Sequence, residues 1–153
     1  MQRPTEYATL ISKGFFENAP ATPGAAQALL ESAQEHLSAY ELLTQAGLTA
    51  AAFGAAYDGF SLLFQAMFEY YEIRAPGELR TAGTYVMSRT MDMHPAELCL
   101  IARMHDRRHL LSTECPFPPP TKDEGQALAK LIEKYLPIVH ATVGLLQPTD
   151  MAA

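Results

Sequence analysis

The segment from Thr49 to about Ile73 constrains the fold most, because it is rich in helix formers and apolar on nearly every side. A helix of this kind lies at the centre of a bundle or in a subunit interface. Two small residues within it, Gly54 and Gly59, would let a neighbouring helix approach closely. We therefore expect this helix to be central. Its large apolar residues are Phe53, Tyr57, Phe60, Leu63, Phe64, Met67, Phe68 and Tyr71.

Breaks rich in Pro and Gly separate the other helical segments, and short connections between long helices favour antiparallel neighbours. The predicted fold is all-α: a compact antiparallel bundle of about five helices over about residues 25–146, after an N-terminal extension over about 1–23, in one domain spanning 1–153. The expected helices are Thr5–Phe16, Ala25–Ala46, Thr49–Ile73, Glu78–Thr90, Ala96–Thr113 and Lys122–Leu146.

Several residues predict where these helices begin, end or bend. Thr49 is expected as an N-cap, Gly47 ends the preceding helix, and Pro95 suits a first helical position. Pro137 is expected to bend the last helix, because proline removes a backbone donor. The run CPFPPP at residues 115–120 is predicted to be a stiff, extended connection.

Charge and composition exclude some classes of protein. Charged residues make up 18% of the chain and hydrophobic residues 48%, so we expect part of the surface to be buried in an oligomer, most simply a homodimer. The net charge of -6 argues against a broad basic surface that coats nucleic acid. The apolar runs are interrupted by polar residues, which predicts no membrane span.

The N-terminal sequence and the cysteines suggest a cytoplasmic protein. No cofactor is expected, because the chain has no Gly-rich phosphate loop. The opening MQRPTEYATL lacks the basic-then-apolar pattern of a signal peptide. Cys99 and Cys115 have no CxxC spacing, so both are expected to be reduced thiols. Cys99 lies in an apolar stretch and is predicted to be a small core residue.

The run RMHDRRH, from Arg103 to His109, is the chain's concentration of chemically versatile side chains. It holds three of the 11 Lys and Arg residues and two of the five His residues. On a helix, Arg103 and Arg107 share one face, as do His105 and His109, and Asp106 can meet His109. We expect this segment to carry any binding or catalysis.

Two chemistries and one structural role suit this cluster. Arg holds phosphate, and a neutral His oriented by Asp106 can take a proton from a ribose hydroxyl, as a metal-independent ribonuclease requires. His105 and His109 also have the spacing that presents two imidazoles to one metal ion. Alternatively, the cluster has a structural role. The helix dipole favours basic residues in the last half of a helix, and Asp106 pairs with Arg103 or Arg107. Asp58 needs a partner in its apolar helix, and an Arg or His of the cluster would serve.

The order of helices resembles the HEPN family (higher eukaryote and prokaryote nucleotide-binding domains) from about Ser32 to Val143. The likeness rests on the helix SAQEHLSAYELL with its turn QAGL, the small-and-aromatic helix AAAFGAAYDGFSLLFQAMF, a later helix with the Arg/His cluster, and a closing helix that begins TKDEGQALAKLI. The resemblance implies a helical dimer. Many members are metal-independent ribonucleases, often toxins paired with a nucleotidyltransferase-like antitoxin, and others are inactive partners or scaffolds.

The family's nuclease signature, an Arg followed along the helix by a His, fits this chain in two registers. In the first, Arg103 and His109 are the pair and Asp106 takes the polar role, so these three would be catalytic, while His105, Arg107 and Arg108 would bind RNA or nucleotide. In the second, Arg108 is the family Arg and the His position falls on Thr113, which implies an inactive member. A non-enzymatic dimerisation or adaptor module is therefore the alternative function, and a metal-binding bundle is the third.

Overall fold

A computed structural model describes residues 3–113 and 118–144, apart from the side chains of residues 78 and 110–113. The described residues confirm an all-α chain: they form six α-helices, the first of them in the N-terminal extension, and they add a two-stranded sheet that was not predicted. The elements are α1 (Thr5–Ser12), β1 (Glu17–Asn18), α2 (Ala25–Gln45), α3 (Thr49–Tyr70), β2 (Ile73–Arg74), a 3-10 turn (Gly77–Leu79), α4 (Arg80–Thr90), α5 (Pro95–Thr113) and α6 (Lys122–Gly144).

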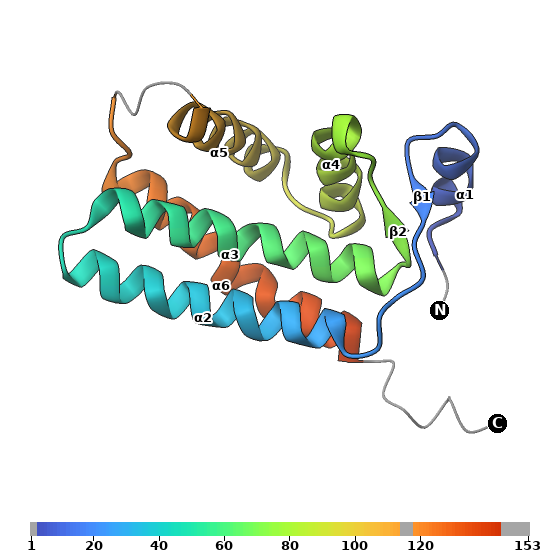
Figure 1. The fold of residues 1–153 in the computed structure, drawn as a ribbon, viewed down its shortest axis with the longest axis horizontal. Coiled ribbons are helices and arrows are strands. Elements are labelled where there is room, and N and C mark those ends of the chain that lie inside the picture. Colours follow the sequence, from blue (N-terminus) through green and yellow to red (C-terminus); the bar gives the residue numbers. More distant parts are fainter. Residues whose placement is uncertain (1–2, 114–117, 145–153) are drawn as a thin grey trace.

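Helix α3 lies at the centre of the molecule, which confirms the prediction from its apolar sequence. It packs along α2 and α6, and its buried side chains join theirs in one core. Figure 1 shows α2 and α3 running in opposite directions, with α6 in the same sense as α3. Gly59 allows the close packing: a Cβ added there would lie 2.8 Å from His36 Cβ of α2 and 3.2 Å from Ile132 Cδ1 of α6.

A glycine turn joins α2 to α3. Gly47 has a φ of 75°, a left-handed conformation that glycine adopts at little cost. The Leu48 N–H bonds Leu43 O at 2.9 Å and the Gly47 N–H bonds Thr44 O at 3.0 Å, the two bonds of a Schellman motif. Helix α3 begins at Thr49 with Leu48 as N-cap, so the predicted capping role of Thr49 is wrong by one position.

Helices α4 and α5 lie on the side of α3 away from α2, as Figure 1 shows. Helix α4 contributes the buried residues Met87 and Ser88, and α5 contributes Ile101 and Met104. Helix α5 begins at Pro95 as predicted, because a proline there loses no hydrogen bond that the helix would make. This second layer positions the cluster from Arg103 to His109.

The N-terminal segment packs into the same core. Tyr7 is fully buried against Phe16 and Tyr71, and its hydroxyl lies 2.5 Å from Thr90 Oγ1 of α4. Strand β1 pairs antiparallel with β2, with Glu17 opposite Arg74 and Asn18 opposite Ile73.

Other expectations differ from the structure at single positions. Helix α1 ends at Ser12 and α3 at Tyr70, because the chain then turns into β1 and β2, so Phe16 and Ile73 lie outside the helices predicted for them. Cys99 is exposed and not in the core, since it lies on the outer face of α5. Cys115 and the first half of the predicted extended run, residues 115–117, lie outside the described residues. Each helix in the described part is too short or too polar to cross a membrane.

Candidate functional site

The cluster on α5 is divided by exposure to solvent. His105, Arg107 and Arg108 are half-buried and contact other elements, whereas Arg103, Asp106 and His109 are exposed. The division follows from helical geometry, because residues 105 and 108 lie one turn apart on the side that packs on α3. The three predicted catalytic residues are therefore more exposed than the three predicted binding residues.

Arg108 binds the carboxylate of α3. Its Nη2 lies 3.3 Å from Asp58 Oδ1 and 3.4 Å from Oδ2, and its guanidinium lies 5.9 Å from the centre of the Tyr57 ring. This pair confirms the expectation that Asp58 takes its partner from the cluster. Because the charge of Arg108 is occupied by an intramolecular carboxylate, Arg108 is poorly suited to hold a phosphate in this conformation.

Arg107 joins α5 to the beginning of α6. Its Nε donates to Glu124 Oε1 at 3.1 Å, and its Nη2 donates to Pro119 O at 2.8 Å and also to Pro118 O. The other carboxylate oxygen of Glu124 accepts the Thr121 N–H at 2.7 Å, while Thr121 Oγ1 accepts the Glu124 N–H at 3.2 Å. This reciprocal pair is a capping box that begins α6, so Glu124 serves two structural roles.

His105 lies between α3 and α4. Its Nδ1 is 2.8 Å from the Tyr57 hydroxyl and its Nε2 is 3.3 Å from Thr81 Oγ1. Burial raises the pKa of Tyr57 above its ordinary value, so this phenol is protonated at neutral pH. We assign the His105 tautomer in which the Tyr57 hydroxyl donates its hydrogen bond to Nδ1. The ring hydrogen is then on Nε2, toward Thr81.

The exposed face of α5 carries Arg103, Asp106 and His109 in steps of three residues. Such steps keep side chains close together along a helix, so the three form a short stripe. The proposed structural pairing of Asp106 with Arg107 is not formed, because Arg107 pairs with Glu124 instead. Among the described side chains, none forms an ion pair with Arg103 or Asp106.

The described residues contain no group of three His, Cys, Asp or Glu side chains that could hold a metal ion. His105 faces inward to Tyr57, whereas His109 is exposed, so their shared spacing does not direct both imidazoles to one point. The two histidines of the metal-binding alternative are thus divided in the same way as the rest of the cluster.

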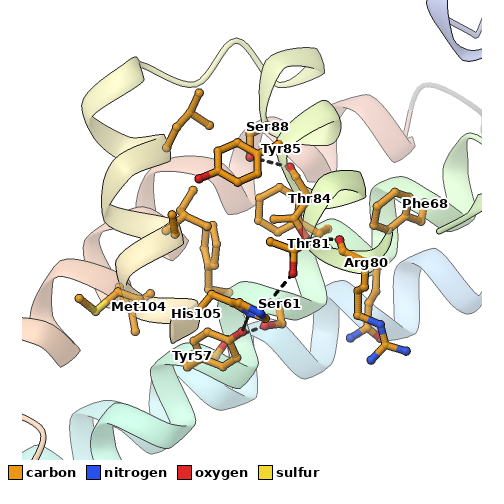
Figure 2. Close-up of a pocket in the computed structure, with 17 residues that line it drawn as sticks. Tyr57, Ser61, Phe68, Arg80, Thr81, Thr84, Tyr85, Ser88, Met104 and His105 are labelled. Atoms are coloured by element: carbon orange, nitrogen blue, oxygen red, sulfur yellow. Dashed lines mark hydrogen bonds between the residues drawn. The ribbon is translucent and has the colours of Figure 1, made fainter. Parts of the chain in front are cut away.

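A cavity of about 120 Å³ between α3, α4 and α5 was not expected from the sequence. Figure 2 shows Tyr57, Ser61 and His105 together at one end of it, and Tyr85 and Ser88 at the other. One signal in the sequence points to it: α4 carries Thr81, Thr84 and Ser88 at helical spacing, a hydroxyl stripe that faces the most apolar helix of the chain.

These observations define an all-α protein whose cluster helix packs beside the central helix, with one charge pair between them, and which encloses a small cavity beside His105. Comparison with models of protein families, with curated proteins and with solved structures finds no match for this chain.

Proposed function

We propose that this protein is a non-catalytic, HEPN-like dimerisation module, and that the exposed face of α5 pairs two copies of the chain. One observation carries the proposal: His105, Arg107 and Arg108 are used in contacts with α3, α4 and the beginning of α6. Three of the six residues that a nuclease site would need for binding or chemistry are therefore occupied within the fold.

The stripe on α5 is self-complementary under two-fold symmetry. In a two-fold interface, if residue i of one copy contacts residue j of its mate, then j also contacts i. Arg103 and Asp106 are exposed, carry opposite charges and lie about one turn apart. Two antiparallel α5 helices can thus place each Arg103 opposite the Asp106 of the other copy, so the same two residues supply both charge pairs.

Charge reversal tests this pairing. Arg103→Glu or Asp106→Arg alone places like charges opposite each other in both halves of the interface, which is unfavourable. The double variant restores both pairs with their signs exchanged. In analytical ultracentrifugation, we expect each single variant to have the molecular mass of a monomer. The double variant should have the molecular mass of a dimer again. Lys130→Glu, on the exposed side of α6, is the control and leaves the dimer intact. A wild-type monomer, or single variants that stay dimeric, would contradict the proposal.

RNA cleavage is the second candidate, and a different observation favours it: Arg103, Asp106 and His109 are all exposed on one helix. In a dimer paired through α5, two such sets would lie close together. Arg103 would hold phosphate, His109 would act as base or acid, and Asp106 would orient it. The register with Arg103 as the family Arg is preferred for this candidate, because Arg108 is paired with Asp58.

The two candidates are distinguished by a cleavage assay without metal. If the second is correct, purified protein cleaves a structured RNA in the presence of EDTA, and His109→Ala abolishes cleavage while it leaves the circular dichroism spectrum unchanged. In that case a nucleotidyltransferase-like antitoxin is the expected partner, and co-expression with such a protein should relieve toxicity. Absence of cleavage in a protein that is dimeric through Arg103 and Asp106 favours the first proposal.

A further inference from the structure

The cavity between α3, α4 and α5 has an apolar body. It is lined by five apolar residues that are each less than one-tenth exposed: Phe60 and Phe64 of α3, Ile101 and Met104 of α5, and Leu128 of α6. An engineered apolar cavity of about 150 Å³ binds benzene, so the space of about 120 Å³ here suits one ring or a short branched chain. The body of any ligand is therefore small and apolar.

One rim of the cavity is polar and carries a cation. The hydroxyl groups of Tyr57 and Thr81 flank His105 there, and Ser61 lies beside them, as Figure 2 shows. Arg80 lines the cavity as well, and among the described side chains no carboxylate pairs with it. A cation without a partner beside an apolar space is suited to a ligand that combines a ring with an anionic group.

The cavity meets a wider groove at the same arginine. Gln65, Phe68 and Arg80 line both the cavity and an open groove of about 750 Å³ along α2, α3 and β2. A ligand whose ring lies in the cavity against Phe60 and Phe64 could keep its charged end at Arg80, beside solvent. This arrangement avoids the large cost of burying a charge.

We propose that this cavity binds a small aromatic or branched-chain carboxylic acid, with its apolar part in the cavity and its carboxylate at Arg80. Arg donates two parallel hydrogen bonds to a carboxylate, which makes this anion favourable over a neutral group. The site is independent of the proposed pairing through α5, because Arg103 and Asp106 are exposed and neither lines the cavity.

Benzoate and toluene are the two probes, and the methyl group of Met104 is the reporter. Met104 is fully buried and lines the cavity, whereas Met67 is buried in the same core but does not line it. With methionine methyl groups labelled with ¹³C, we expect benzoate to shift the Met104 signal saturably at millimolar concentration and to leave Met67 unmoved. Toluene should shift Met104 as well, because it enters the apolar body.

The contribution of Arg80 is isolated with a matched pair of variants in α4. Arg80→Gln removes the cation from the cavity, and Arg89→Gln removes another exposed arginine of α4, which lies 3.9 Å from Glu6 and does not line the cavity. We expect Arg80→Gln to weaken benzoate binding about tenfold and to leave toluene binding unchanged, which corresponds to the loss of one charged contact. Arg89→Gln should bind both probes like the wild type.

Two results would overturn the proposal. If benzoate up to about 10 mM, the scale of very weak binding, leaves the Met104 signal of the wild type unmoved, the cavity is no site for such acids. If Arg80→Gln binds benzoate as tightly as the wild type, Arg80 does not select the anion and the assigned ligand class is wrong.

Discussion

Arg108 of α5 lies 3.3 Å from Asp58 of α3, and this ion pair links a residue of the cluster to the central helix. The two residues are separated by most of α3, the β2 strand and α4 in the sequence. The pair explains two features of the sequence at once: Asp58 has a partner for its charge within an apolar helix, and Arg108 has a role within the fold. The relationship changes the expected role of Arg108 from RNA binding to packing.

The Arg108–Asp58 pair should contribute little to stability. Its side chains are 38% and 47% exposed, so solvent screens the attraction. We expect a double-mutant cycle of Asp58→Asn and Arg108→Gln, measured by urea unfolding, to give a coupling energy below about 1 kcal/mol. A coupling well above that value would show that water is excluded from the pair.

Two glycines of α3 should respond oppositely to alanine. At Gly59 a Cβ would lie 2.8 Å from His36 Cβ, closer than packed atoms come, so Gly59→Ala should destabilise the fold by about 1–3 kcal/mol. At Gly54 the nearest side-chain atom, an Arg108 guanidinium nitrogen, would be 3.7 Å away, an ordinary contact. Gly54→Ala should therefore stabilise the helix by about 0.5–1 kcal/mol. Equal effects on the free energy of unfolding would refute the packing of α3 against α2 and α6.

The N-terminal segment should be required for stability. Tyr7 is fully buried, so Tyr7→Ala should lower the free energy of unfolding by about 3–5 kcal/mol. Phe15 belongs to the same segment but is 42% exposed, and Phe15→Ala should cost less than about 1 kcal/mol. Thermal or denaturant unfolding compares the two variants. A small effect of Tyr7→Ala would mean that α1 is an appendage.

Glu97 should make stability depend on pH. Burial disfavours its charge, but hydrogen bonds from Lys134, Tyr135 and the His94 N–H outweigh this and lower its pKa from the ordinary 4.5. A carboxyl whose pKa is lower in the folded state stabilises the fold above the unfolded pKa and loses this contribution as the pH falls through the folded value. Glu97→Gln should therefore lower the melting temperature at pH 7 by about 3 °C.

The difference between this variant and the wild type should shrink as the pH falls from 4.5 through the lower folded-state pKa of Glu97, below which protonation removes the charge in both states. Glu133→Gln, on the exposed side of α6, is the matched control and should show little effect at either pH. A difference for Glu97→Gln that does not change with pH would mean that its contribution comes from shape and not from charge.

The sequence by itself determined the local structure. Apolar spacing and Pro and Gly breaks located all six helices of the described residues, and α2, α4 and α6 begin within two residues of their predicted positions. The all-round apolar character of α3 placed it at the centre, and its lone Asp58 required a partner from elsewhere. These features depend on residues close in sequence or on the cost of burying a particular group.

Only the tertiary structure decided which side of α5 faces the core. Helical spacing shows that His105 and His109 lie one turn apart, but it does not show that the first contacts Tyr57 while the second is exposed. The same holds for Cys99, whose apolar neighbours suggested burial. The short β1–β2 pair and the cavity beside Arg80 could not be predicted from the sequence either. Both form where segments distant in sequence come together, and no local sequence pattern predicts that contact.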